Sequence, residues 1–524
     1  MNTPLSEFIS VLPVLERHGA ADPRITDLVY DSRQASPGSL FFALPGLHAD
    51  GSAFIGQAVA KGAVAVIHKA PLDSYDPAVV YLRVEDPRFV MSPAAAAFYG
   101  HPSKDLVVIG VTGTEGKSTT VSLIFQLLRL CGKKAGFIST VEYCVADEVM
   151  PNPEHQTTPE ALTVQRKLAE MRDNGLEYAV VESSSHGLSV RTNRLGDVLF
   201  DVGIMTNVTH EHLEFHGTHE QYKSDKANLF RSLDRHDHVK RGRTVPSFGV
   251  VNEEDPASGY FRNATRQPVY GYSTWADVSQ GLYGSEITTD ASGVNFVLAE
   301  SGDRTYQVRI NLPGAFNAYN TMATVITVSR LLGTPVAGLV GLLTELKPVR
   351  GRMTVIDEGQ PFEVLVDYAH TPSSFQAIFP SLRKRISGKI ISLFGSGGER
   401  DTLKRPEQGR IAADYSDIVI LADEDPRGED PVELLEMIAA GCPEKKRGTG
   451  LYIIPNRPQA IRRAISLAKE GDLVLLLGKG HENSIIYKDH TDPYDEIQEA
   501  RQALHEAGWT GRTAAGSAAH GGKK

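Results

Sequence analysis

Cysteine is scarce in this sequence, with three among 524 residues, at positions 131, 144 and 442. They are too few and too scattered for a disulfide framework, and no pair has the spacing of zinc ligands. Long apolar runs are also lacking: no segment approaches about 18 residues, and residues 1–14 hold no basic region followed by an apolar one. We therefore expect a cytoplasmic protein that is not inserted in a membrane.

An excess of positive charge is lacking as well. The chain has 54 Lys and Arg residues against 64 Asp and Glu residues, which gives a formal net charge of −10. Such a protein has no general attraction to nucleic acid or to anionic membranes, so any polyanion must be bound by a local site. We expect small-molecule partners, no nucleic acid, and a monomer.

The chain is longer than one hydrophobic core usually serves. Short apolar runs alternate with helical stretches, which predicts an α/β fold in three domains. We expect a small α/β domain at 1–104, a central P-loop ATPase-like domain with a parallel sheet at 105–347, and a doubly wound Rossmann-like domain at 348–507. The Gly-, Ala- and Ser-rich tail at 508–524 is predicted to be disordered.

The second and third domains contain the clearest strand patterns. Buried strands are predicted at 106–112, 178–182, 202–206, 247–252, 363–367, 389–394, 417–422, 451–454 and 472–477. In the first domain an Ala-rich segment predicts a helix at 93–99. Because ligands of a doubly wound sheet lie at the carboxyl ends of its strands, motifs at those ends are candidate sites.

A glycine loop separates the strand at 106–112 from a helix that begins at Lys117. In this context backbone N–H groups can wrap phosphates, Lys117 can reach the β- and γ-phosphates, and the Ser118 hydroxyl can bind Mg²⁺. The glycine usually found six residues before the lysine is Val111 here, so the loop is a variant. The alternative is a glycine turn with an incidental Gly-Lys-Ser. The predicted ATP loop consists of Gly113, Thr114, Glu115, Gly116, Lys117, Ser118 and Thr119.

The segment from Thr112 to Thr120 resembles the ATP loop of the Mur ligases and of the related folylpolyglutamate synthetases. Further motifs resemble only the Mur enzymes that add the third peptide residue, the MurE type. The N-terminal ones, similar to a uridine-nucleotide domain, are Asp31-Ser32-Arg33 and Asp50-Gly51. The others are Glu182-Ser-Ser-Ser-His-Gly-Leu188, Thr206-Asn-Val-Thr-His-Glu-His-Leu-Glu-Phe-His216, Asp367-Tyr-Ala-His-Thr-Pro372, Phe394-Gly-Ser-Gly-Gly-Glu-Arg-Asp401 with Lys404-Arg-Pro406, and Gly478-Lys-Gly-His-Glu482.

This resemblance implies an ATP-dependent ligase. ATP would phosphorylate the terminal D-Glu carboxylate of UDP-MurNAc-L-Ala-D-Glu, and the amine of a diamino acid would attack the acyl phosphate with loss of phosphate. Lys117, His212 and Lys226 are the implied catalytic residues. Mg²⁺ is the implied cofactor, because charge must be neutralised throughout. The implied metal ligands are Ser118, Glu182, His212 and carbamylated Lys226.

Two of these assignments have alternatives. The histidines at 210, 212, 216 and 219 could form a zinc site, but the interleaved Glu211 and Glu214 and the resemblance favour a hard cation. Lys226 would be an ordinary solvated helix lysine by its sequence alone. The resemblance instead implies that CO₂ converts it to a carbamate, an anion that can bind metal where a protonated lysine would repel it.

The resemblance also implies the remaining substrate contacts. Asn317, Arg352 and Asp367 are similar to further ATP-contacting residues. The segment 188–201 looks two residues longer than usual, so Arg191 could take the place of Arg194. The implied contacts to the UDP-muramoyl dipeptide are Ser32, Thr157, Thr158, Ser184 and Arg194.

The diamino acid would be read by the third domain. Relatives that add diaminopimelate usually carry Asp-Asn-Pro-Arg where this chain has Glu424-Asp425-Pro426-Arg427. An extra carboxylate at Asp425 disfavours a distal carboxylate and favours a lone ammonium, which argues for L-lysine or L-ornithine. Arg427 argues for meso-diaminopimelate, because it could bind the distal carboxylate in a bidentate pair. We expect L-lysine or L-ornithine in preference to meso-diaminopimelate. The implied acceptor residues are Arg400, Glu424, Asp425, Pro426, Arg427, Gly478 and Glu482.

Three other functions are compatible with parts of the sequence. A folylpolyglutamate synthetase shares the phosphate loop but should lack a domain before residue 105. A P-loop kinase or GTPase would not explain the third α/β domain, and no Asn-Lys-x-Asp signature is present. A catalytically silent relative would not need Lys117, Ser118, Glu182, His212 and Lys226 together.

Overall fold

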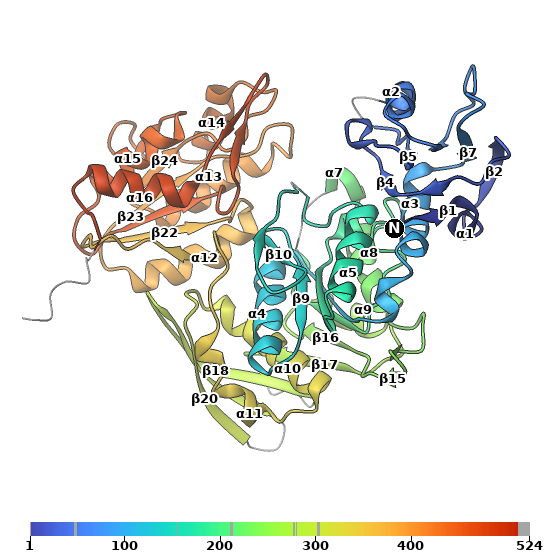
Figure 1. The fold of residues 1–524 in the computed structure, drawn as a ribbon. Coiled ribbons are helices and arrows are strands. Elements are labelled where there is room, and N and C mark those ends of the chain that lie inside the picture. Colours follow the sequence, from blue (N-terminus) through green and yellow to red (C-terminus); the bar gives the residue numbers. More distant parts are fainter. Residues whose placement is uncertain are drawn as a thin grey trace, which may run out of the picture. The chain divides into compact units, whose positions relative to one another are not determined.

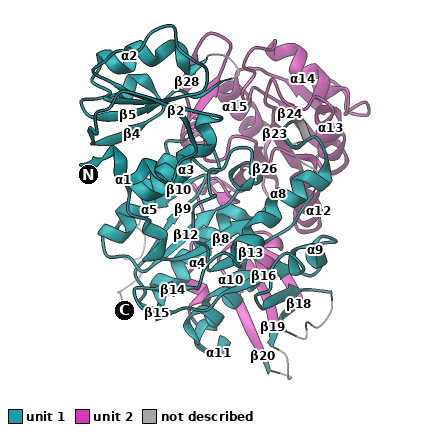
Figure 2. Cartoon of the chain, turned by 90° about the vertical axis from the view of Figure 1, so that its right-hand side faces the viewer, with its two compact units in different colours: residues 1–283, 299–304, 320–341 teal, residues 284–298, 305–319, 342–524 magenta. Residues whose placement is uncertain are grey.

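The structure is a computed structural model that describes residues 2–46, 50–154, 156–209, 213–275, 278, 280–300 and 304–511. The predictions for His212 and for a disordered tail beyond residue 511 lie outside the described residues. Two compact units are present (Figure 2): one comprises residues 1–283, 299–304 and 320–341, the other 284–298, 305–319 and 342–524. The domain limits expected from the sequence stay predictions.

The first unit begins with a five-stranded sheet in the order β2-β7-β6-β5-β4 (Figure 1). All neighbouring strands are parallel except β2 and β7. Its elements are α1 (Leu5–Ile9), β2 (Val14–His18), β4 (Asp27–Val29), β5 (Ser39–Phe42), α2 (Ile55–Ala60), β6 (Ala65–His68), β7 (Val80–Val84) and α3 (Pro87–Phe98).

Helix α3 corrects one prediction, because it begins at Pro87 instead of Pro93 and contains Pro93 in its interior. Asp86 caps its first turn by accepting a hydrogen bond from the Arg88 N–H at 2.9 Å. Pro93 has no N–H for the carbonyl of Phe89. The Asn193 side-chain amide donates to that carbonyl at 2.9 Å, so the freed acceptor is satisfied from a distant loop.

A larger sheet follows, and its strands from β9 to β17 are parallel in the order β9-β12-β8-β13-β16-β17. Apolar side chains fill both faces, as expected for a parallel sheet covered by helices. The strands are β8 (Val107–Thr112), β9 (Ala135–Ile138), β12 (Tyr178–Glu182), β13 (Val202–Met205), β16 (Phe248–Asn252) and β17 (Val269–Ser273). The helices are α4 (Lys117–Leu130), α5 (Ala161–Asp173), α6 (Ser185–Leu188), α7 (Leu213–His216), α8 (His219–Ser232) and α9 (Ser258–Arg262).

The shorter edge elements of this sheet were not predicted, nor were three long strands that follow β17 in the chain. The edge strands are β10 (Glu142–Cys144) and β11 (Met150–Pro151). The long strands are β18 (Gly281–Asp290), β19 (Gly293–Glu300) and β20 (Arg304–Ile310), and two helices follow, α10 (Phe316–Leu332) and α11 (Val336–Val340).

The second unit contains a six-stranded sheet in the order β21-β22-β26-β23-β24-β25, parallel except for β21. Separate apolar cores cover its two faces, which confirms the doubly wound prediction. The strands are β21 (Thr354–Val355), β22 (Glu363–Asp367), β23 (Ile390–Phe394), β24 (Ile418–Leu421), β25 (Leu451–Ile453) and β26 (Leu473–Leu477), with a hairpin of β27 (Ser484–Ile486) and β28 (Thr491–Pro493). The helices are α12 (Pro372–Arg385), α13 (Lys404–Tyr415), α14 (Pro431–Ala439), α15 (Arg457–Leu467) and α16 (Glu496–Glu506).

Among the described residues, no helix is both long enough and apolar enough to cross a membrane.

Candidate functional site

The predicted phosphate loop joins the end of β8 to the start of α4. Gly116 immediately precedes α4 with φ +83°, and a Cβ there would lie 2.7 Å from the Asn320 side chain. A Cβ on Gly113 would lie 1.8 Å from Oγ1 of Thr206, so only glycine fits. The Asn207 side-chain oxygen accepts hydrogen bonds from the N–H groups of Thr114 and Glu115, at 3.2 and 2.8 Å. The segment after β13 and the side chain of Asn320 in α10 therefore border the loop and restrict its shape.

Two lysines contact carbonyl groups of this loop. Lys117 Nζ donates to the Thr114 carbonyl at 2.7 Å. Lys226, from α8, donates to the Gly113 carbonyl at 2.6 Å and lies over the Tyr222 ring. The Lys226 side chain is buried, which excludes the interpretation as a solvated surface lysine. The structure thus brings both predicted catalytic lysines to the phosphate loop.

Ser118, in the first turn of α4, lies beside Glu182, at the end of β12. The Ser118 hydroxyl donates to Oε1 of Glu182 at 3.0 Å, and the Thr140 N–H donates to Oε2 at 2.8 Å. Glu182 is 1% exposed, and no lysine or arginine within the described part of the chain forms an ion pair with it. Hydroxyl and carboxylate oxygens suit Mg²⁺, and a buried carboxylate without a cationic partner favours a bound cation. The residues present therefore fit a hard metal ion.

Two of the residues predicted to bind the dipeptide, Thr158 and Ser184, lie at the same strand end. Thr158 Oγ1 donates to the Glu182 carbonyl at 2.9 Å and accepts from the Ser184 N–H at 2.9 Å. Thr157, beside Thr158, is partly exposed. Ser32 lies in the N-terminal sheet region, where its hydroxyl donates to the Gln57 side chain at 2.7 Å. Thr158 and Ser184 are thus tied to the metal-candidate strand β12.

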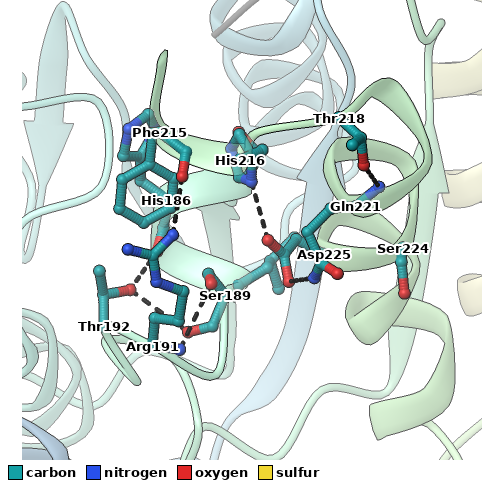
Figure 3. A network of polar contacts seen from close by, with 12 residues as sticks. His186, Ser189, Arg191, Thr192, Phe215, His216, Thr218, Gln221, Ser224 and Asp225 are labelled. Atoms are coloured by element: carbon teal, nitrogen blue, oxygen red, sulfur yellow. Dashed lines mark hydrogen bonds and ion pairs between the residues drawn. The ribbon is translucent and has the colours of Figure 1, made fainter. Parts of the chain in front are cut away.

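Arg194 and Arg191 are the two alternatives for the arginine that contacts the dipeptide, and the structure shows different partners for each. Arg194 donates to the Thr158 carbonyl at 2.9 Å and to Glu160 at 3.0 Å, and Arg88 shares the same Glu160 oxygen at 2.7 Å. Arg191 instead donates to the Phe215 carbonyl at 2.7 Å and lies over the Phe215 ring (Figure 3). Arg194 is therefore the arginine beside a predicted dipeptide residue. The sequence did not identify Glu160 as part of this site, because its role follows only from its contacts with Arg88 and Arg194.

A buried hydrogen-bond chain links α6, α7 and α8. His216 contacts Asp225 through Nδ1 at 2.8 Å, as Figure 3 shows, and Ser185 through Nε2 at 3.0 Å. Gln221 also donates to Asp225 at 3.0 Å. Both ring nitrogens of His216 have protein partners, which argues against a zinc ligand at that position. His210 and His212 lie outside the described residues.

In the second unit, three further residues are predicted to contact ATP. Asp367, at the end of β22, accepts hydrogen bonds from the N–H groups of Met353 and Ala369, at 2.8 and 2.7 Å. Burial raises the pKa of Asp367, and the nearby Arg352 opposes this rise. Arg352 lies over the Tyr368 ring at 4.6 Å. Asn317 donates to the Pro313 carbonyl at 2.7 Å. Asp367 and Arg352 are therefore neighbours.

The predicted acceptor residues lie beyond the carboxyl ends of β23, β24 and β26. A Cβ on Gly478 would lie 2.5 Å from the Glu424 carboxylate, so glycine is needed for this approach. Glu424 is buried, and this burial raises its pKa. Asp425 and Glu482 share a contact with Lys479, which was not predicted.

A backbone hydrogen bond fixes the loop after β23 against the tetrapeptide at 424–427. The Gly398 N–H donates to the Asp425 carbonyl at 2.8 Å, and a Cβ on Gly398 would clash with the Pro426 carbonyl. Arg400, in the same loop, is exposed. Arg427 donates its N–H to the Ile486 carbonyl at 2.9 Å. The tetrapeptide is therefore held between this loop and β27.

Comparison with known proteins gives a consistent result. Three family models match the sequence: Mur ligase family, catalytic domain, over residues 24–99; Mur ligase middle domain, over 111–328; and Mur ligase, glutamate ligase domain, over 351–480. A UDP-N-acetylmuramyl-tripeptide synthetase of Treponema denticola is 55% identical over 522 residues, covering 95% of this chain and 97% of the relative. One of Treponema pallidum is 51% identical, covering 96% and 97%. A solved UDP-N-acetylmuramoyl-L-alanyl-D-glutamate–2,6-diaminopimelate ligase has 27% identity and a TM-score of 0.61, covering 97% of this chain and 99% of that one.

Proposed function

The chain belongs to the Mur ligase family, and from that premise we propose that it joins a diamino acid to UDP-MurNAc-L-Ala-D-Glu through an acyl phosphate. It is an ATP-dependent ligase of the MurE type, which acts in peptidoglycan synthesis. The match at residues 24–99 covers the domain that a folylpolyglutamate synthetase should lack, so we do not retain that alternative.

One observation supports the proposal most strongly. Side-chain oxygens of Ser118 and Glu182 are buried 3.0 Å apart next to the phosphate loop, in which glycine is sterically required at positions 113 and 116. A glycine loop before a helix offers N–H donors to phosphates, and the two oxygens can act as ligands of Mg²⁺. This combination suits transfer of the γ-phosphoryl group.

The proposed reaction has two steps. An oxygen of the D-Glu carboxylate attacks the γ-phosphorus, the bond to the β-phosphate oxygen breaks, and ADP leaves. The neutral amine of the acceptor then attacks the acyl carbon, phosphate leaves with the former carboxylate oxygen, and the amine proton is lost. Lys117 would swing from the Thr114 carbonyl to the γ-phosphate, where its charge stabilises the transferred group.

Metal ions would be held by Ser118, Glu182, His212 and carbamylated Lys226. A bound Mg²⁺ supplies charge neutralisation for the phosphoryl group. Carbamylation of Lys226 would convert a buried cation into an anion and would keep one N–H for the Gly113 carbonyl, 2.6 Å away. Reaction with CO₂ therefore removes the cost of burying an ammonium beside a metal.

The dipeptide would lie along Thr157, Thr158 and Ser184, with Arg194 binding a carboxylate. Arg194 suits this role because its Nε is buried and has no hydrogen-bond partner within the described residues. Asn317, Arg352 and Asp367 are proposed to contact ATP from the second unit, and Ser32 to contact the uridine nucleotide. The acceptor would meet Arg400, Arg427, Gly478, Glu482 and the residues from Glu424 to Pro426.

Release of phosphate tests the proposal. The purified protein is given ATP, Mg²⁺ and UDP-MurNAc-L-Ala-D-Glu, with lysine, ornithine or diaminopimelate added separately. We expect phosphate release with at least one acceptor. Release with none of the three contradicts the proposed function.

A further inference from the structure

Glu160 has a buried carboxylate that lies between two arginines of the first unit. Its Oε1 accepts a hydrogen bond from Arg88 Nη1 at 2.7 Å and from Arg194 Nη2 at 3.0 Å. Glu160 occupies the N-cap position of α5, where a carboxylate usually accepts hydrogen bonds from backbone N–H groups, but its side chain accepts none from the described backbone of that helix. The carboxylate therefore binds the two arginines instead of capping its own helix.

The loop that carries Arg194 is fixed against helix α3, which carries the other arginine. The Asn193 side-chain amide donates to the Phe89 carbonyl at 2.9 Å. The Asp197 N–H donates to the Ser92 hydroxyl at 3.1 Å. These two contacts lie on either side of Arg194 in the chain, so the position of its guanidinium depends on α3.

The three charged side chains lack a partner for part of their charge. Oε2 of Glu160 and Nε of Arg194 are both buried and have no hydrogen-bond partner within the described residues. Neither arginine forms an ion pair with a second acidic residue in the described part of the chain. Two guanidinium cations therefore share one carboxylate, and the excess positive charge of one unit favours a bound anion.

The anion that fits best is a carboxylate of the dipeptide. Arg194 donates to the carbonyl of Thr158, a residue proposed to contact the dipeptide. D-Glu has two carboxylates, and the proposed reaction phosphorylates only one of them. The other stays anionic throughout the reaction, and a guanidinium can bind it through two parallel hydrogen bonds.

We propose that Arg88 and Glu160 are positioning residues for the dipeptide: Glu160 holds Arg194 in place, and Arg88 supplies the positive charge that the non-reacting carboxylate of D-Glu balances. Without Arg88, Glu160 would neutralise Arg194 and leave that carboxylate uncompensated. The proposal rests on the proposed function, because it takes the D-Glu dipeptide as the substrate. Neither residue was predicted from the sequence.

The test compares two ligands that differ in one group. Kd is measured by titration calorimetry for UDP-MurNAc-L-Ala-D-Glu and for an analogue in which the non-reacting carboxylate is a carboxamide, with Mg²⁺ and a non-hydrolysable ATP analogue present. Both ligands contain the UDP diphosphate, so the ratio of the two Kd values reports the carboxylate alone. We expect the wild type to prefer the carboxylate by about 10-fold or more, the scale of one charge-assisted hydrogen bond. Equal binding of the two ligands, or binding of neither, overturns the proposal.

Variants then identify the residues responsible. Arg88→Gln should reduce the preference for the carboxylate by about fivefold, whereas Arg88→Lys, which keeps the charge, should stay within about twofold of the wild type. Glu160→Gln should prefer the carboxylate at least as strongly as the wild type, because the amide oxygen still accepts hydrogen bonds but no longer neutralises Arg194. A merely structural network would be weakened by both substitutions, so the opposite signs separate the two roles. An unchanged preference in Arg88→Gln, or a reduced one in Glu160→Gln, overturns the proposal.

Arg166→Gln is the matched control, because this exposed arginine on α5 pairs only with Glu170 among the described residues, at 4.0 Å on the surface. It should leave the ratio of the two Kd values unchanged. Failure of the proposed function has a different appearance, namely a wild type that prefers the carboxylate but releases no phosphate from ATP with any of the three acceptors.

Discussion

Lys226 Nζ donates a hydrogen bond to the carbonyl of Gly113, the first residue of the phosphate loop, at 2.6 Å. This contact joins helix α8 to the loop, which is 113 residues earlier in the chain. It places the amine that could react with CO₂ beside the proposed phosphates and metal. Several predictions depend on this arrangement of strand ends and helices.

Lys226→Ala should lower kcat by about 100-fold or more, because it removes both the loop contact and the proposed metal-binding carbamate. Depleting CO₂ should lower the activity of the wild type, and bicarbonate should restore it. The matched control is Lys223→Ala on the same helix, where the partly exposed lysine pairs with the exposed Glu220. Wild-type activity in Lys226→Ala, with or without bicarbonate, rules out the carbamate.

Glu182→Gln should raise the Mg²⁺ concentration for half-maximal activity by about 10-fold or more, since a neutral amide binds a hard cation less strongly. Titration of phosphate release with Mg²⁺ measures this effect. Glu177→Gln, at an exposed position just before β12, is the control. Equal Mg²⁺ curves for Glu182→Gln and the wild type would remove Glu182 from the metal site.

Arg194→Gln should raise KM for UDP-MurNAc-L-Ala-D-Glu by about 10-fold and leave KM for ATP unchanged, because a charge-assisted contact to one substrate is lost. Arg191→Gln is the control, since Arg191 lies over Phe215. Steady-state kinetics in both substrates separate the two roles. The reverse result, with the larger effect at Arg191, would give Arg191 the contact.

Asp423, two residues after the end of β24, should make the stability of the protein depend on pH. Burial raises its pKa to about 6, and its Oδ1 has no hydrogen-bond partner among the described residues. The ordinary value is 3.8, so the unfolded chain loses the proton first, and stability falls as pH rises between these values. Above about pH 6 the whole penalty is present; allowing for solvent screening it is about 1 kcal/mol.

Asp423→Asn should therefore show a smaller fall in the free energy of unfolding between about pH 4 and pH 7. Urea unfolding at several pH values measures it, with the exposed Asp237→Asn as the control. An Asp423→Asn profile parallel to that of the wild type would show that this carboxyl is not the cause.

The sequence predicted those parts of the fold that depend on local pattern. The apolar run ending at Glu182 predicted β12 with its exact limits, and Gly113 and Gly116 predicted the loop. Helix α3 was predicted too short because only the Ala-rich segment 93–99 indicated a helix. Pro93 lies inside the observed helix, and the carbonyl that it leaves without an N–H is satisfied by Asn193, 100 residues away from Pro93 in the chain. The local sequence pattern around residue 93 cannot indicate a hydrogen-bond partner as distant in the chain as Asn193.

The same limit applies to the candidate sites. Glu182 and Ser118 were predicted because each follows a recognisable strand or loop, and the structure brings them together. The charge on Asp425 was visible, but its ion pair with Lys479 depends on contact between the loops that follow β24 and β26. The geometry of parallel strand ends, and not residue identity alone, determines which charges remain for a ligand.

The central claim is that the D-Glu carboxylate is activated by phosphorylation and then joined to a diamino acid. It is tested most directly with UDP-MurNAc-L-Ala-D-Glu in which both oxygens of the terminal carboxylate are ¹⁸O, in the presence of ATP, Mg²⁺ and the acceptor. Mass spectrometry of both products should show a UDP-muramoyl tripeptide and one ¹⁸O atom in each phosphate released. Tripeptide formed together with phosphate that contains no ¹⁸O would contradict activation of the carboxylate by phosphorylation. Hydrolysis of ATP to unlabelled phosphate without any tripeptide would contradict it as well.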